Sequence, residues 1–573
     1  MTILKRHKIG ELIPRLLAAF VTVLLYNLLT TKENFTEFSF YNQMSFALLF
    51  LCVLVLFLIF CFVKNNMLIN IMTIFLTLIY FVCAAALKQD YYFSFGLCTV
   101  ICVLVAFLNF EEFKLKIKNK TVWIVAVSLI IIFTLFVGLI CCLYYKNYKT
   151  PCYDFGLFAQ MFRYMKETGE CLITCERDAL LNHFAVHFSP IYYLLLPIYI
   201  IFPSPCTLLI LQAFIVASGL LPLILISKHY KLSSAGIILF SVCYILYPAF
   251  FGGCFWYLHE NCFLLPLLLW YLYFSEKEKI IPTVLFALLT LAVKEDAAVY
   301  VAVIALYFIF IRKNYKCNFW ILLFSVLYFI LVTNLMSVFG EGIMSDSRYG
   351  DYIYDNGGLF SVVKSVIQNP IFAIYQIFKK EKFLFVLQVL CPLGFLPMFI
   401  KKPEKLILLI PFILVNLMTN YPYQYDIGFQ YTFGSGAILF YLAITNYSEL
   451  GTKRRKVLLC AALSSVIIFS GGYLSKVTYI EDYINMSHQR EVIDEAVKLV
   501  PEDASVAAST FLIANLSDRE FIYELETTKQ EAEYIVFDLR NSEERSELKK
   551  YLNDKYTILF YDEEIICVLK NNS

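Results

Sequence analysis

The chain has 573 residues, of which 60% are hydrophobic and only 16% are charged. Soluble proteins carry roughly 25% charged residues. This composition and a mean hydropathy of +0.70 therefore exclude a soluble multidomain enzyme and a disordered chain. The 47 basic and 45 acidic residues leave a formal net charge of +2, which gives no sign of a nucleic-acid partner. The composition predicts a polytopic membrane protein.

Apolar runs follow one another along most of the chain. A membrane span needs about 20 mainly apolar residues, and the sequence holds about fifteen candidate runs, several of them short. They are Ile13–Leu29, Ser45–Val63, Met67–Leu87, Phe93–Phe110, Thr121–Tyr145, Leu208–Ser227, Ser233–Phe251, Cys262–Phe274, Ile280–Val293, Ala297–Ile311, Phe319–Phe339, Phe383–Ile400, Leu406–Thr419, Tyr431–Ile444 and Val457–Leu474.

Basic residues between the runs predict the orientation, because Lys and Arg concentrate in cytoplasmic loops. The N-terminal segment at residues 5–8 is basic, and so are several later connections. All of these basic segments lie on the cytoplasmic side only if the proline-flanked run Phe188–Phe202 does not cross the membrane completely. We therefore expect a multi-pass protein of the cell membrane with a cytoplasmic N-terminus. The long loop at residues 146–187 and the C-terminal region are then outside.

After Leu474 the sequence becomes rich in Glu, Asp and Lys, and short alternating patterns indicate strands. The predicted fold class is an all-α polytopic transmembrane bundle with a small C-terminal extramembrane α/β domain. Its parts are N-terminal accessory spans at 1–120, a transmembrane core at 121–479 and the outer soluble α/β domain at 480–573. Within that domain we expect helices at Arg490–Val500 and Ser542–Leu552, and strands at Ser505–Ser509, Tyr534–Asp538, Thr557–Tyr561 and Ile565–Leu569.

The 18 cysteines mostly lie inside apolar runs, where cysteine behaves as a small hydrophobic residue. No C-x-x-C pair with zinc spacing occurs, so no structural metal site is expected. Cys152, Cys171 and Cys175 share one polar loop and could form a disulfide in an oxidising compartment.

Polar and ionisable residues near membrane depth are costly, and they are usually functional or paired. In the predicted topology nearly all the unusual ones gather at the outer face, which indicates a site. The candidate catalytic residue is Asp154. The candidate substrate-binding residues are His183, His187, His259, Glu260, Lys294, Glu295, Asp296, Tyr425 and Gln430.

Each candidate also has a structural interpretation. Asp154 could cap a helix. His183 and His187 are four residues apart and could bind a metal, but no Glu lies between them as in H-E-x-x-H, so hydrogen bonding at the interface is the simpler explanation. The sequence Lys294-Glu295-Asp296 interrupts two apolar runs, and at least one of its charges should be buried in an ion pair.

Four motifs occur in a fixed order: Y-D-F-G-x-F-x-Q from Tyr153, H-F-S-P from His187, His259-Glu260 after an aromatic cluster, and Lys294-Glu295-Asp296. This order resembles a family of predicted bacterial and archaeal membrane proteins placed in the GT-C glycosyltransferase superfamily. Dolichyl-phosphate-mannose mannosyltransferases and aminoarabinose transferases belong to the same superfamily. The resemblance covers about residues 121–540. The chain departs from the family pattern at His259-Glu260, where His-Pro is frequent, and near Gln430-Tyr431, where a histidine is frequent.

The resemblance implies a GT-C-like core that transfers a sugar at the outer membrane face. The donor is a polyprenyl-phosphate sugar, the acceptor is an unidentified glycan, lipid or protein, and Asp154 is the acceptor-activating base. A phosphate leaving group needs a cation, for which Lys294, Arg163 and Arg177 are candidates. No D-x-D triplet occurs in the outer loops, so neither a metal nor another cofactor is expected.

Two other functions remain open. A membrane transporter or lipid flippase should show repeated halves and polar residues along a path through the membrane, and the sequence shows neither feature. A non-catalytic envelope assembly protein would use the C-terminal domain as a binding module and would tolerate Asn in place of Asp154.

Overall fold

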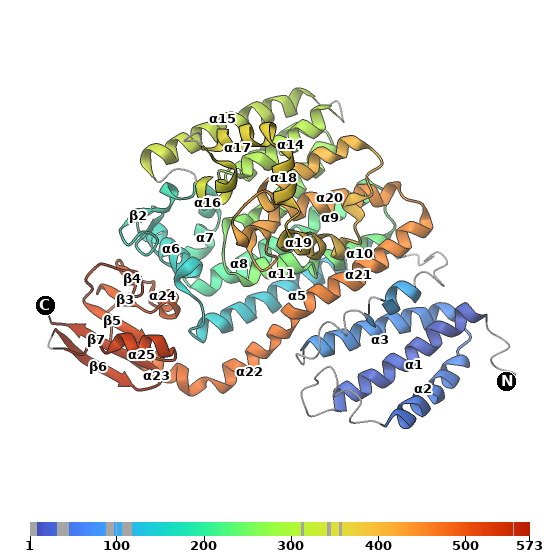
Figure 1. Cartoon of the computed structure of the whole chain (residues 1–573), viewed down its shortest axis with the longest axis horizontal. Coiled ribbons are helices and arrows are strands. Elements are labelled where there is room, and N and C mark those ends of the chain that lie inside the picture. Colours follow the sequence, from blue (N-terminus) through green and yellow to red (C-terminus); the bar gives the residue numbers. More distant parts are fainter. Residues whose placement is uncertain are drawn as a thin grey trace.

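The computed structural model describes most of the chain (Figure 1). The described residues are 8–30, 45–86, 97–98, 100–105, 117–310, 315–340, 345–354, 358–553 and 555–572. The basic residues at 5–7, 114–116 and 312–313 lie outside these ranges, as does part of the expected span Phe93–Phe110. The side chains of Tyr153 and Asp154 also lie outside the described structure, although their backbone is described.

Seven helical stretches of the described residues are long and apolar enough to cross a membrane. They are α1 (Ile9–Thr30), α3 (Asn66–Ala86), α5 (Asn119–Lys146), α8 with α9 (Pro205–Ser218 and Leu220–His229), α10 with α11 (Ser234–Ile245 and Pro248–Phe255), α15 (Tyr315–Phe339) and α21 with α22 (Thr452–Leu474 and Thr478–Asn485). Shorter apolar helices are α2 (Phe46–Cys61), α13 (Ile280–Leu291) and α14 (Ala297–Phe310). These helices confirm a multi-span helical membrane protein.

Fewer helices reach spanning length than the sequence predicted, because hydropathy does not distinguish a lipid-facing helix from one buried in protein. α12 (Leu264–Glu276) and α20 (Phe433–Glu449) are short, and neighbouring helices bury most of their side chains. Prolines, which lack an amide hydrogen, break the runs Phe383–Ile400 and Leu406–Thr419. These two runs become α19 (Lys380–Leu390) and the short helices η8 (Cys391–Leu393), η9 (Leu396–Met398), η10 (Pro403–Leu409) and η11 (Phe412–Leu417).

The proline-flanked run at residues 188–202 does not form a spanning helix. It divides into η5 (Pro190–Leu194) and α7 (Leu196–Ile201), which have five and six residues. A crossing helix needs about 20 residues, so the expectation that this run does not cross completely agrees with the structure.

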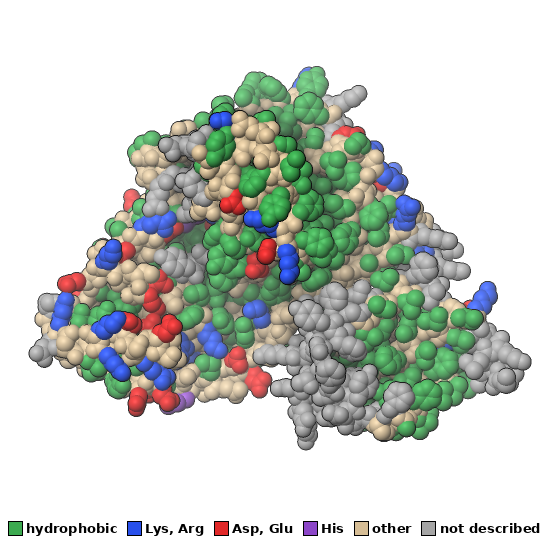
Figure 2. Space-filling view, viewed as in Figure 1, with side chains coloured by type: hydrophobic (Ala, Val, Ile, Leu, Met, Phe, Trp, Pro, Cys, Tyr) green, Lys and Arg blue, Asp and Glu red, His purple; other side chains and the backbone are tan. Residues whose placement is uncertain are grey.

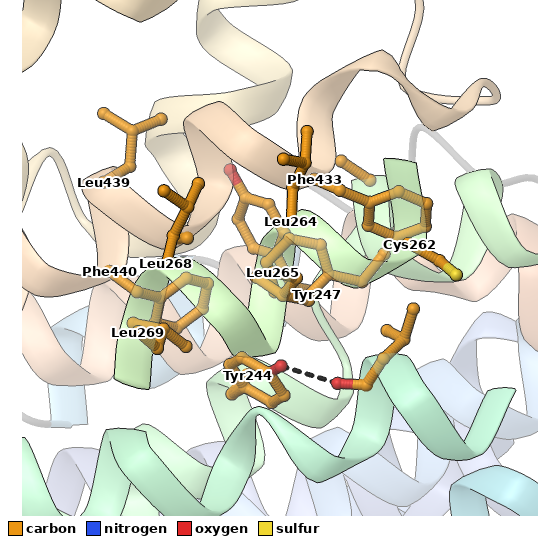
Figure 3. Close-up of a cluster of buried hydrophobic side chains, with 14 of the residues drawn as sticks. Tyr244, Tyr247, Cys262, Leu264, Leu265, Leu268, Leu269, Phe433, Leu439 and Phe440 are labelled. Carbon is orange, nitrogen blue, oxygen red and sulfur yellow. Dashed lines mark hydrogen bonds between the residues drawn. The ribbon is translucent and has the colours of Figure 1, made fainter. Parts of the chain in front are cut away.

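The centre of the bundle is a dry layer between α12 and α20 (Figure 3). Leu264, Leu265 and Leu268 of α12 face Phe433 and its neighbours on α20 in this view, and all are buried. The tyrosine hydroxyls in this layer are also satisfied: that of Tyr244 donates to the Val216 carbonyl oxygen at 2.6 Å, and that of Tyr247 donates to the Val389 carbonyl oxygen at 2.7 Å. This layer fixes the helix ends that carry the polar cluster described below.

The C-terminal region forms a five-stranded sheet of order β4-β3-β5-β7-β6, in which β4, β3 and β5 are parallel and β7 and β6 antiparallel. The strands are β3 (Val506–Ala508), β4 (Ile522–Glu524), β5 (Tyr534–Asp538), β6 (Tyr556–Asp562) and β7 (Ile566–Asn571). Its helices are α23 (Ser487–Val497), α24 (Thr510–Leu516) and α25 (Ser542–Leu548). Every expected element is present; β4 and α24 were not predicted.

Acidic and basic side chains gather over this sheet, whereas hydrophobic side chains dominate the visible surface of the helical part (Figure 2). This division fits a membrane-embedded bundle with an extramembrane sheet region. Three short helices follow α15 at the top of Figure 1: α16 (Ser345–Tyr349), α17 (Leu359–Gln368) and α18 (Pro370–Ile377).

The sheet region is docked on the first long loop, which contains η3 (Cys152–Gly156), α6 (Leu157–Thr168), β1 (Leu172–Ile173) and β2 (Leu181–Asn182). The Gln160 amide donates to the Glu520 carbonyl oxygen at 3.0 Å. Asp178 accepts a hydrogen bond from the Lys529 amide at 2.8 Å, and the Tyr148 hydroxyl donates to Asp494. The loop and the C-terminal region therefore form one continuous packed body.

Candidate functional site

Asp154 lies in η3, a single π-helical turn between α5 and α6. Its neighbour Phe155 is fully buried and contacts the rings of Tyr145 and Tyr257, with centroids 5.8 and 5.6 Å away. A Cβ added at Gly156 would lie 2.7 Å from Ile513 Cγ2. The close approach that Gly156 permits is therefore that of α24 from the C-terminal region.

Phe158, one turn further along α6, connects this segment to two of the candidate histidines. Its ring centroid lies 5.5 Å from that of His183 and 5.4 Å from that of His259. The ring centroid of Tyr192 also lies 5.4 Å from that of Phe158. The η3–α6 segment thus adjoins the polar cluster.

The centre of that cluster is a buried ion pair between Glu260 of η6 (Glu260–Phe263) and Lys294, which precedes α14. Lys294 Nζ lies 2.9 Å from Glu260 Oε1, and the two residues are 4% and 1% exposed. The Tyr192 hydroxyl donates to Glu260 Oε2 at 2.7 Å and accepts from the Glu260 amide at 3.0 Å. Both carboxylate oxygens therefore have a partner.

The charges of this pair stabilise each other strongly. Burial disfavours the carboxylate, but attraction from Lys294 and the nearby histidines outweighs it and holds the pKa of Glu260 well below its usual value. Burial likewise opposes the ammonium group, yet Glu260, Glu295 and Asp296 together raise the pKa of Lys294. Both groups are therefore charged at neutral pH.

This pair predicts a defined pH dependence. Because the pKa of Glu260 is lowered on folding, its contribution to stability is complete above the unfolded value of about 4.3 and is lost as the pH falls through the folded value. Glu260→Gln should therefore lower the apparent melting temperature at pH 7, and the gap to wild type should begin to narrow as the pH falls below about 4.3. Thermal unfolding in detergent over this range tests the prediction, and a gap that stays constant with pH would contradict it.

A second pair lies beside the first. His187 Nδ1 is 3.0 Å from Glu295 Oε1, and the Phe188 amide donates to Glu295 Oε2 at 3.3 Å. Burial disfavours ionisation of Glu295, but the attraction of His187 prevails and lowers its pKa. At Asp296, burial and the charge of Glu295 outweigh the attraction of Lys294 and raise the pKa. The three consecutive residues 294–296 thus have different electrostatic roles.

His183 belongs to η4 (His183–Ala185) and is 3% exposed. Its Nδ1 lies 3.1 Å from Glu176 Oε2, whereas its Nε2 has no hydrogen-bond partner within the described structure. The ring centroids of His183 and His187 are 6.0 Å apart. Across the described residues, no group of three or more His, Cys, Asp or Glu side chains is arranged to hold a metal ion.

The last candidates lie on the segment before α20, which contains η12 (Pro422–Tyr425) and η13 (Gln430–Thr432). Gln430 is 4% exposed, and η13 packs against η6 of the cluster. Tyr425 instead lies beneath Lys382 of α19, whose Nζ is 5.3 Å from the ring centroid. The structure therefore brings Gln430 to the cluster and gives Tyr425 a different neighbour.

The other predicted cations also have partners. Arg163 lies 3.0 Å from Glu167 on the surface of α6, and the exposed Arg177 donates to the Glu176 carbonyl oxygen at 2.8 Å. Cys152, Cys171 and Cys175 are free thiols, so the possible disulfide is not formed.

The sequence model of a family described as "Predicted membrane protein (DUF2079)" matches residues 144–565. The chain belongs to the DUF2079 family. The match includes the polar cluster, the η3–α6 segment and nearly all of the C-terminal sheet of this DUF2079 protein, whereas α1 to α3 precede it. No curated protein matches the chain.

Three residues of the cluster were not predicted from the sequence. Tyr192 lies in the proline-flanked run at residues 188–202, for which the sequence predicted only that it does not cross the membrane completely. Gln212 of α8 accepts from the His259 amide at 2.8 Å, and a buried amide inside an apolar run was a usable signal for it. Arg348 of α16 lies within electrostatic reach of Asp296 and Glu295. It occurs in a polar connection of ordinary composition, which gave no signal.

Proposed function

We propose that this DUF2079 protein is an integral-membrane glycosyltransferase of the GT-C type. It transfers a sugar from a polyprenyl-phosphate donor to an acceptor at the outer face of the cell membrane. The observation that supports this proposal best is the buried cluster of Glu260, Lys294, His187 and Glu295. The cluster adjoins the η3–α6 segment, which carries Asp154 and contacts the docked C-terminal region.

The proposed reaction is a displacement at the anomeric carbon of the sugar. The acceptor oxygen forms a bond to that carbon, and the bond between the carbon and the phosphate oxygen breaks, leaving its electron pair on the phosphate. The hydroxyl proton of the acceptor passes to Asp154, the general base. Glu260 is unsuited to this role, because Lys294 and the histidines lower its pKa. Instead, the Lys294–Glu260 pair positions the surrounding groups.

A transporter or flippase and a non-catalytic assembly protein are the rival functions. The charged residues of the cluster lie on short connections between helices, whereas a transport path would place them at successive depths along the spans. A pure binding module would have no need of paired buried charges next to the η3 turn. Both considerations favour the enzyme.

The function is tested with the purified full-length protein in liposomes. Radiolabelled polyprenyl-phosphate sugars are supplied with a membrane extract as the source of acceptors. The expected result is loss of label from the donor together with label in a new product. Movement of intact donor between leaflets without cleavage would instead identify a flippase and overturn the proposal.

A further inference from the structure

Arg348 is held rigidly at the edge of the polar cluster. Its guanidinium carbon lies 5.1 Å from the ring centroid of Tyr421 and 5.3 Å from that of Tyr431. Its carbonyl oxygen accepts from the Asn420 amide at 2.7 Å and from the Thr419 hydroxyl at 3.1 Å. Both the backbone and the guanidinium plane are therefore fixed against the segment that leads to η13.

The charge of Arg348 is not neutralised by direct contact. Lys294 has a carboxylate oxygen at 2.9 Å, whereas the interactions of Arg348 within the described structure are with Tyr431 and, at longer range, with Asp296 and Glu295. Burial disfavours its charge, but these neighbours outweigh it and raise the pKa of Arg348. The guanidinium thus remains charged and retains donor capacity, because its five N–H groups exceed its observed partners.

Buried acceptors lie on the adjoining elements. Gln430 Oε1 and Asn261 Oδ1 belong to residues that are 4% and 3% exposed, and neither atom has a hydrogen-bond partner among the described residues. Asp296 Oδ1 is likewise buried and has no hydrogen-bond partner among the described residues. A buried unpaired acceptor costs about 1–3 kcal/mol. Acceptors of this kind indicate a ligand that brings hydroxyl donors, as a sugar does.

We propose that Arg348 binds the phosphate of the lipid-linked donor, with Gln430, Asn261 and Asp296 accepting hydrogen bonds from the sugar hydroxyls. This assignment rests on the proposed function. A guanidinium can donate two parallel hydrogen bonds to phosphate oxygens. It offsets the negative charge that remains on the phosphate when the bond to the anomeric carbon breaks.

The assignment is tested by binding of radiolabelled undecaprenyl phosphate to the purified full-length protein in detergent. Arg348→Gln should weaken binding about 10- to 100-fold, the loss expected when one charged hydrogen-bonding partner is removed. Arg454→Gln, which removes the same charge from an exposed position near the start of α21, should bind as wild type does. Wild-type affinity in Arg348→Gln would overturn the assignment.

Competitors identify the part of the ligand that Arg348 recognises. Undecaprenol, which lacks the phosphate, should bind wild type and Arg348→Gln equally. Inorganic phosphate should compete with undecaprenyl phosphate in wild type only at a much higher concentration if the lipid contributes to binding. A difference between the two proteins for undecaprenol would contradict recognition of the phosphate.

A measurement on the wild-type protein avoids any effect of the substitution on folding. Phenylglyoxal modifies accessible arginines, and mass spectrometry locates the modified residues. Undecaprenyl phosphate should protect Arg348 and leave Arg454 unprotected, and modification of Arg348 at an unchanged rate would refute the assignment. If wild type binds undecaprenyl phosphate through Arg348 but transfers no sugar, the proposed function fails and the assignment stands. If wild type does not bind undecaprenyl phosphate at all, both the proposed function and the assignment of Arg348 are wrong.

Discussion

Asp154→Asn should abolish sugar transfer while the protein folds and inserts normally. The amide keeps the shape of the carboxylate and its hydrogen-bonding oxygen, but it cannot accept the proton of an acceptor hydroxyl. Loss of a general base lowers the rate by about 10²- to 10⁴-fold. The expected result is therefore donor binding at wild-type affinity with transfer below about 1% of the wild-type rate.

The matched control is Asp503→Asn, which makes the same chemical change at an exposed position of the C-terminal region. It should transfer sugar at the wild-type rate. Membrane insertion and elution volume on a sizing column establish that both variants are folded. An Asp154→Asn protein that turns over as fast as wild type would exclude Asp154 as the general base, and with it the mechanism described here.

Lys294→Met should destabilise the protein strongly, because it leaves the Glu260 carboxylate buried with only the Tyr192 hydroxyl as a side-chain partner. Removing one member of a buried ion pair costs about 3–5 kcal/mol. The apparent melting temperature in detergent should fall accordingly, and binding of undecaprenyl phosphate should weaken because the cluster loses its central cation.

The double variant Lys294→Met with Glu260→Gln removes the isolated charge as well. It should recover most of the lost stability but not the activity, which separates stability from positioning of the substrate. Lys555→Met breaks an exposed pair with Glu531 and should hardly change the melting temperature. Equal destabilisation by the two single lysine variants would show that the Lys294–Glu260 pair has no special role.

The sequence predicted the extramembrane elements better than the number of spans. β5 begins and ends at Tyr534 and Asp538 as expected, because a short apolar run bounded by polar residues is characteristic of a strand. β4 has three residues, one of which is Glu524, and it was not predicted. The sequence of α20 was predicted to be a membrane span because it is apolar on all sides. Only the packing of the other helices shows that α20 is enclosed by protein.

For the candidate site, the rule that polar residues at membrane depth act together predicted the members of the cluster but not their pairing. The sequence predicted that at least one charge of residues 294–296 is buried in an ion pair, but it did not identify the partner, which for Lys294 is Glu260. That pairing depends on how η6 meets the start of α14, which is a property of the fold. Arg348 was not found, because its importance comes from the tyrosines of a segment about 70 residues later in the chain.

The close packing of α24 on the η3 turn has a consequence for biosynthesis. The turn at residues 152–156 is synthesised well before the helix that covers it at Ile513, because α24 comes much later in the sequence. Chains are synthesised from the N-terminus at about 5–20 residues per second. The neighbourhood of Asp154 therefore remains incomplete until the C-terminal region has been released, and a truncated or stalled chain should be inert.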